Sequence, residues 1–302
     1  MKTLLVLVCL VMFGAAFAGY STDGNYSIRT TGDEGPGSDD EINITVLNTW
    51  AIPAGDQALG IDFIDMWYQD NVIVYIDNDN DTIWGMDTDD GSSISSAEWP
   101  LDANNTNPFG ICLVNHTGAE KLHVNDFGYD GIFAKYFADP WLEYNSLTDN
   151  MGRGMDYHAG SDKIFEFYTI TNPGAYQWHV AMYTPEQSTG NTYELDCFIT
   201  SDWTGSGLCV YPMWNGNTGI AVTMYDSGWI RFFEYPGYAG EQYYAHAVIP
   251  YSMDSSYGLT YSESKDTFFH CYQLGGTYYI SELEISEANL EAGTWGSIKT
   301  AF

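Results

Sequence analysis

The sequence predicts an all-β protein, a β-propeller of five four-stranded blades. Three observations support this prediction. A glycine-anchored unit occurs five times, each unit contains short β-forming runs separated by turn residues, and helical periodicity is nearly absent. Only the stretch SEANLEA at Ser286–Ala292 has the composition of a helical turn or two.

The N-terminus has the pattern of a secretory signal peptide. Lys2 is followed by a short apolar run, and the small residues of AFA at Ala16–Ala18 fit a cleavage site. We expect residues 1–18 to be removed and the protein to be secreted or periplasmic, with a retained anchor as the alternative. No later segment is apolar enough to span a bilayer.

The composition is that of a folded, strongly acidic protein. Lys and Arg number 9 against 41 Asp and Glu, which gives a formal net charge of −32. However, 45% of the residues are hydrophobic and 16% are aromatic, so the acidic side chains cover a real core. A field of this sign repels nucleic acid and anionic membrane surfaces, and neither is an expected partner.

Four cysteines follow the leader, and their wide spacing contains no CxxC pair. A zinc site is therefore not expected. Because export permits disulfide bonds, two bridges and four buried free thiols both remain open. The four residues are Cys112, Cys197, Cys209 and Cys271.

The repeat is anchored by a glycine that precedes an apolar residue. In each unit, three runs rich in Ile, Val, Phe, Tyr and Trp are split by Asp, Asn, Gly or Ser, and a fourth run closes the unit. Four antiparallel strands in about fifty residues is the pattern of a propeller blade. The anchors are Gly60, Gly110, Gly154, Gly207 and Gly258, separated by 50, 44, 53 and 51 residues.

In this repeat plan the chain resembles the secreted β-propellers of the broad NHL/YVTN-like kind. The resemblance covers residues 44–302, which we take as the propeller domain, and it includes no functional signature. It implies that the first strand of each blade lines an axial channel. Residues 19–43 would form an N-terminal segment that ends in an acidic linker, GDEGPGSDDE at Gly32–Glu41.

The two ends of the domain provide one outer strand too many for five blades. Both ITVLNTWAIP at Ile44–Pro53 and TWGSIKTAF at Thr294–Phe302 fit the outer strand of the last blade. If the N-terminal strand completes that blade, the ring is closed non-covalently between its ends. A sixth, degenerate blade that uses Asn25–Thr31 is the alternative.

The acidic stretch DNDND has the 1-3-5 spacing of an EF-hand calcium loop at Asp77, Asp79 and Asp81. Thr82 stands where the loop needs glycine, and Thr88 stands where it needs glutamate, so the EF-hand pattern fails. We favour a solvated hairpin turn, because Asp and Asn tolerate positive φ. A surface calcium ion is the alternative, and no other cofactor is expected.

The residue two places after each anchor glycine is small or polar. Because side chains alternate along a strand, it lies on the face opposite the apolar residue that directly follows the glycine. Asp62 and Asp156 could act as the paired acid and base of a glycosidase. We favour the interpretation that both carboxylates accept backbone or hydroxyl hydrogen bonds between blades. The full set is Asp62, Cys112, Asp156, Cys209 and Thr260.

Four further residues are candidates for ligand binding. Tyr157 and His158 follow Asp156 near the expected channel mouth, and Trp203 and Trp214 flank the first strand of the fourth blade. Such rings can stack on sugars or anchor a protein partner, although packing within a blade also explains them.

The sequence therefore favours a secreted, non-enzymatic propeller that presents a face or a channel mouth to a protein or glycan ligand. The six histidines form no metal motif, and no nucleophile or nucleotide motif is found. A carbohydrate-active hydrolase or lyase that uses the channel carboxylates is the alternative.

Overall fold

The structure is a computed structural model of the 302-residue chain. It describes residues 41–66, 69–128, 131–136, 139–146, 152–172, 175–187, 190–196, 205–213, 218–225, 228–235, 241–242 and 245–286. Within these ranges every regular element is a β-strand, which confirms the all-β prediction. The same ranges contain no helix with the length and hydropathy of a membrane span. The expected leader, the acidic linker and Ser286–Ala292 beyond its first residue lie outside the described residues.

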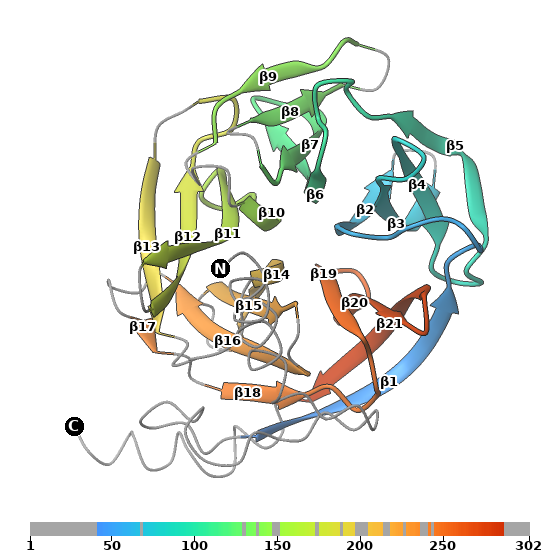
Figure 1. The fold of residues 1–302 in the computed structure, drawn as a ribbon, viewed down its shortest axis with the longest axis vertical. Coiled ribbons are helices and arrows are strands. Elements are labelled where there is room, and N and C mark those ends of the chain that lie inside the picture. The colour runs from blue at the N-terminus through green and yellow to red at the C-terminus, as the bar shows by residue number, and fades with distance from the viewer. Residues whose placement is uncertain are drawn as a thin grey trace, which may run out of the picture.

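The described strands form four hydrogen-bonded sheets around one axis (Figure 1). One of them, with eight strands, contains two successive antiparallel units, which gives five units, or blades. The first blade is β2 (Ile61–Met66), β3 (Gln69–Asp77), β4 (Thr82–Asp87) and β5 (Ser93–Pro100), and the second is β6 (Pro108–His116), β7 (Ala119–Asp126), β8 (Ile132–Lys135) and β9 (Leu142–Tyr144). The third is β10 (Gly152–His158), β11 (Lys163–Asn172), β12 (Ala175–Tyr183) and β13 (Gly190–Asp196), with β17 (Glu241–Gln242) parallel at its edge. The fourth is β14 (Gly205–Pro212), β15 (Thr218–Met224), β16 (Trp229–Tyr235) and β18 (Ala245–Val248), and the fifth is β19 (Ser255–Ser262), β20 (Thr267–Leu274), β21 (Thr277–Ser286) and β1 (Glu41–Ala51).

The five anchor glycines lie around the axis, each against the backbone of the next blade. A Cβ atom at any of them would collide with that backbone, so only glycine permits the close approach. The contact passes from the fifth blade back to the first, and the described residues thus close the ring after five units. The nearest backbone atoms to such a Cβ are Phe109 O at 2.0 Å for Gly60, Arg153 O at 2.1 Å for Gly110, Leu208 N at 2.3 Å for Gly154, Leu259 N at 2.5 Å for Gly207, and Ile61 N at 2.8 Å for Gly258.

The ring is closed by the N-terminal strand. β1 pairs antiparallel with β21, from Asn43 opposite Ser286 to Ala51 opposite Tyr279. Its first residues also pair in parallel with β18, where Glu41 lies opposite His246, and this pairing joins the fourth and fifth blades. Among the described residues the N-terminal strand thus completes the last blade, which is the case in which the sequence implies non-covalent closure. Residues 294–302 and the segment 25–31 of the six-blade alternative lie outside the described residues.

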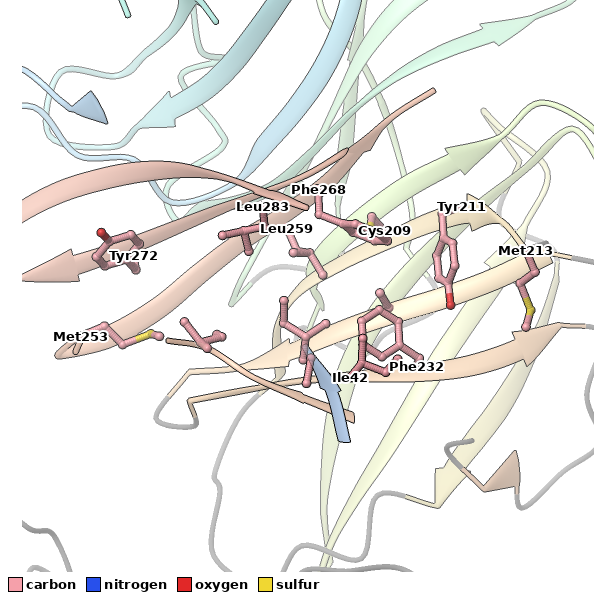
Figure 2. Packing of buried hydrophobic residues seen from close by; sticks show 14 residues of the cluster. Ile42, Cys209, Tyr211, Met213, Phe232, Met253, Leu259, Phe268, Tyr272 and Leu283 are labelled. Carbon is pink, nitrogen blue, oxygen red and sulfur yellow. The ribbon is translucent and has the colours of Figure 1, made fainter. Parts of the chain in front are cut away.

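Apolar side chains fill the space between blades. Between the fourth and fifth blades, Tyr211 packs edge-on against Phe268 with ring centroids 5.2 Å apart. Ile42 from β1 enters the same cluster and is 3% exposed (Figure 2). Complete burial of such a side chain contributes roughly 1.5–3 kcal/mol, so packing as well as strand pairing holds the closing strand.

The described cysteines, Cys112, Cys209 and Cys271, are buried free thiols. Burial raises the pKa of all three thiols above its ordinary value. Because two disulfide bonds would need Cys112, Cys197, Cys209 and Cys271 together, the alternative of two bridges is wrong. Cys197 lies outside the described residues.

Candidate functional site

The two axial carboxylates connect neighbouring blades. The backbone N–H of Leu113 donates to Asp62 Oδ2 at 2.6 Å, and the N–H of Val210 donates to Asp156 Oδ2 at 2.7 Å. The Thr260 hydroxyl donates to Asp62 Oδ1 at 3.1 Å. These are the inter-blade hydrogen bonds that the sequence analysis favoured for both carboxylates.

Burial favours the uncharged form of both Asp62 and Asp156. Asp62 is 6% exposed, and its burial raises its pKa to about 7, although the hydrogen bonds from Leu113 and Thr260 oppose the change. Burial also raises the pKa of Asp156 well above its usual value, and the negative charge of Asp62 adds to the effect. Near neutral pH the axis therefore carries less negative charge than its two carboxyl groups suggest.

A second group of side chains gathers at the end of the axis where the first strands of the blades begin. Arg153 Cζ lies 3.2 Å from the ring centroid of Phe127 and 4.5 Å from that of Phe109. Tyr225 and Tyr257 lie edge-to-face with centroids 5.4 Å apart, and their hydroxyl oxygens are 3.5 Å apart. We call this group the arginine cluster, made up of Phe109, Phe127, Arg153, Tyr225, Tyr257 and Tyr278.

The cluster draws on four blades and is open to solvent on one side. Phe127 and Arg153 are half-buried, and Tyr225 is exposed, whereas Tyr257 is buried. Tyr257 stacks at a tilt on Tyr278 of β21, with centroids 5.3 Å apart. The first strands that carry Phe109, Arg153 and Tyr257 (β6, β10 and β19) surround the centre of the disc in Figure 1.

The Arg153 guanidinium has no acidic partner among the described residues. Burial lowers its pKa to about 10, and the groups that oppose this change are the phenols of Tyr225 and Tyr257. The side chain is therefore charged at neutral pH. Its Nε atom is buried and has no hydrogen-bond partner. A half-buried cation is normally paired with a carboxylate, and a chain with net charge −32 offers many.

Tyr157 and His158, two of the predicted ligand-binding residues, lie at the opposite end of β10 from Arg153. The Tyr157 hydroxyl donates to Asp162 Oδ1 at 2.8 Å, and His116 Nδ1 lies 2.9 Å from the same atom. His158 Nδ1 lies 2.8 Å from Ser161 Oγ, and burial lowers the pKa of the His158 imidazole. Tyr157 and His158 thus each have a hydrogen-bond partner in the turn that follows β10. The other two, Trp203 and Trp214, lie outside the described residues.

The acidic stretch forms the turn between β3 and β4. Asp77 is fully buried, and its Oδ2 accepts hydrogen bonds from Asn80 Nδ2 at 2.6 Å and Trp84 Nε1 at 3.2 Å. Asp79 and Asp81 are exposed, and Asp81 has a φ of 49°. This geometry is that of a hairpin turn organised by one inward carboxylate. Calcium binding by Asp77, Asp79 and Asp81 stays a prediction.

The arginine cluster was not predicted from the sequence. The predicted channel residues stand two places after each anchor glycine, whereas Phe109, Arg153 and Tyr257 each stand directly before one. The sequence pair Arg153–Gly154 could have indicated the cluster, because a residue directly before an anchor glycine also lies near the axis. Tyr225 and Phe127 follow the second strands of their blades, and the repeat alone does not indicate where their side chains point.

No protein-family model and no curated protein matches the sequence. Among solved structures, the chain is similar to glutaminyl cyclase from Myxococcus xanthus, with 10% identity and a TM-score of 0.56, over 82% of this chain and 99% of that one. It is also similar to a streptogramin B lyase, with 12% identity and a TM-score of 0.46, over 80% and 98% of the two chains. The β-propeller domain of Cps50 (Swd1) from Myceliophteria thermophila matches over 80% and 100%, with 9% identity and a TM-score of 0.42. The protein is a β-propeller, and identities this low carry no activity from these proteins to this chain.

Proposed function

We propose that this protein is an exported, non-enzymatic β-propeller of the NHL/YVTN-like repeat kind that binds a protein or glycan ligand at the arginine cluster. The observation that supports the proposal is the charged Arg153 guanidinium, which has aromatic neighbours and no carboxylate partner among the described residues. The export part of the proposal rests on the pattern of the first 18 residues.

The composition of the cluster suits a binding surface. Tyrosine and arginine are enriched among the residues that dominate binding energy, because each combines a large contact area with hydrogen-bond donors. Phe127 and Arg153 are already held against each other, so little side-chain freedom is lost when a ligand binds.

The test is a binding screen of the full mature protein on glycan and peptide arrays. Arg153→Met should abolish the signal on whichever array binds the protein. Lys135→Met is the matched control, because Lys135 is also a cation over an aromatic ring, 5.4 Å from the centroid of Trp141, but it lies on β8. The proposal is wrong if neither array gives a signal or if Arg153→Met binds as the unmodified protein does.

One observation favours the alternative enzyme. A pKa of about 7 for Asp62 suits a general acid at neutral pH, as a carbohydrate-active hydrolase or lyase would require. The hydrogen bonds from Leu113 and Val210 favour a structural role for both carboxylates. Polysaccharide turnover that is abolished by Asp156→Asn, with the fold intact, would replace the binding proposal, whereas binding without turnover would reject the enzyme.

A further inference from the structure

We infer that the arginine cluster recognises a carboxylate group on its ligand. This inference rests on the proposed binding function and specifies the ligand chemistry at the same site. It follows from the orientation of Arg153, from the neighbouring donors and from the absence of a second cation among the described residues of the cluster.

The guanidinium of Arg153 lies over an aromatic ring. Its centre lies 3.2 Å from the ring centroid of Phe127, so one of its faces is covered by an aromatic ring. The N–H groups of a guanidinium lie in its plane, and they therefore point away from the covered face. Two of these N–H groups match the two oxygens of a carboxylate, which is the preferred bidentate pairing of arginine.

Two phenol hydroxyl groups in the same cluster can form further hydrogen bonds with a ligand. Tyr225 is exposed, and its hydroxyl oxygen lies 3.5 Å from that of Tyr257. A phenol can both donate and accept, so this pair can bind a hydroxyl or amide group that stands next to the carboxylate. A uronic acid residue and the C-terminus of a peptide both have this combination of groups.

The described residues of the cluster include a single cation, which does not favour a more highly charged anion. The neighbours of Arg153 are phenylalanine and tyrosine side chains, and the described residues place no lysine or second arginine in the cluster. A phosphate monoester carries nearly two charges at neutral pH and is usually bound by several cations. With a net charge of −32 on the chain, a single guanidinium fits a single negative charge better.

Neither of the two axial carboxyl groups, Asp62 and Asp156, is an ion-pair partner of the Arg153 guanidinium. Asp156 stands three residues beyond Arg153 on β10, which corresponds to about 10 Å along a strand. Asp156 Oδ2 and Asp62 Oδ2 accept hydrogen bonds from the next blade, and the raised pKa of both groups reduces their negative charge further.

The experiment uses the small number of arginines in the sequence. Arg29, Arg153 and Arg231 are the three, so the protein labelled with ¹⁵N-arginine gives three Nε–H signals, and Arg153→Lys identifies one of them. The labelled protein is titrated at constant ionic strength with methyl glucuronide and with N-acetylglycine. Methyl glucoside and N-acetylglycinamide are the uncharged controls.

We expect the Arg153 signal to move and saturate with the acids and to stay in place with the uncharged controls. The acid that saturates at the lower concentration identifies a sugar or a peptide as the source of the carboxylate. Measured on the small acid by ligand-observed NMR, Arg153→Lys should weaken binding about ten-fold through loss of the bidentate contact. Tyr225→Phe, which removes the hydroxyl that lies 3.5 Å from that of Tyr257, should weaken it about three-fold, and Lys135→Met should leave it unchanged.

The inference is overturned if the acids produce no saturable shift, if the uncharged controls produce the same shift, or if inorganic phosphate binds more tightly than either acid. Failure here is distinct from failure of the proposed function. An array signal that depends on Arg153, without a response to the small acids, leaves the binding function in place and rejects the carboxylate. A response to the acids without any array ligand rejects the proposed protein or glycan ligand and keeps the carboxylate site.

Discussion

The carboxylate of Asp62 in the first blade accepts a hydrogen bond from the backbone N–H of Leu113 in the second blade at 2.6 Å. The first strand of a blade has an unpaired edge, so its N–H groups on that side need an acceptor from elsewhere. A side-chain oxygen from the preceding blade provides it here and between Asp156 and Val210. The blades are thus joined at the axis by specific hydrogen bonds as well as by packing.

The first prediction concerns the pH dependence of stability. The pKa of Asp62 is raised to about 7 in the folded protein. Because the folded protein favours the protonated form of Asp62, this group contributes stability that is fully present below its pKa in the unfolded chain, about 4. The contribution is lost as the pH rises through its pKa in the folded protein, about 7. The full difference corresponds to about 4 kcal/mol, which is an upper limit.

Asp62→Asn isolates this effect because asparagine stays uncharged. We expect the stability advantage of the unmodified protein over Asp62→Asn to shrink between about pH 4 and pH 8. Urea unfolding of both proteins at several pH values measures it. An advantage that stays constant across this range would show that Asp62 does not titrate with a raised pKa.

The second prediction concerns the glycine ring. In Gly110→Ala the new Cβ would lie 2.1 Å from the carbonyl oxygen of Arg153, and this backbone atom cannot move away without separating two blades. We expect a loss of about 3 kcal/mol or more in the free energy of unfolding.

Gly118→Asn is the control for this substitution. Gly118 has a φ of 81°, a Cβ atom added there would meet no other atom within 4 Å, and asparagine tolerates that conformation. It should cost less than about 1 kcal/mol. Equal losses for the two variants in denaturant unfolding would mean that the close approach between blades is unimportant.

The third prediction concerns the closing strand. Ile42 is 3% exposed within the cluster between the last two blades, so Ile42→Ala should destabilise the fold by about 2–4 kcal/mol. Thr45→Ala, on an exposed position of the same strand, should change stability by less than about 0.5 kcal/mol. Thermal and denaturant unfolding provide the comparison. Similar values for both variants would show that β1 is held by strand pairing alone.

The fourth prediction concerns calcium at the turn between β3 and β4. Asp77 Oδ2 already accepts hydrogen bonds from Asn80 and Trp84, and Asp79 and Asp81 are exposed. We expect the melting temperature to be the same in calcium and in excess chelator. A clear decrease in chelator that disappears in Asp79→Asn would establish the ion site and reject the hairpin interpretation.

Much of the fold could be predicted from the sequence because the repeat reflects a repeated physical constraint. Gly60 and Gly110 are spaced by one blade, and each lies where two backbones come too close for a side chain. The alternation that places Asp62 and Asp156 on one face also led to the interpretation that they accept inter-blade hydrogen bonds. The structure shows these bonds, since each buried carboxylate lies beside an unpaired strand edge and meets a backbone donor.

The candidate site could not be predicted in the same way. The arginine cluster forms from Arg153 of one blade, Phe127 of a second and Tyr225 of a third, and each side chain is ordinary in its own repeat. Their meeting depends on how far each turn reaches towards the axis, which is a property of the closed ring. Periodicity identifies equivalent positions, but it does not identify contacts between positions that are not equivalent.

The position of β1 also means that the ring can close only after the last strands of the chain have been synthesised. The strand that completes the last blade is the first of the described strands to be synthesised, and its partner β21 emerges more than two hundred residues later. Until β18 and then β21 are synthesised, the early strand has no partner in the ring. Contacts this far apart in the chain form slowly. The growing chain therefore has to keep this unpaired strand from pairing with other molecules until the last strands of the chain are available.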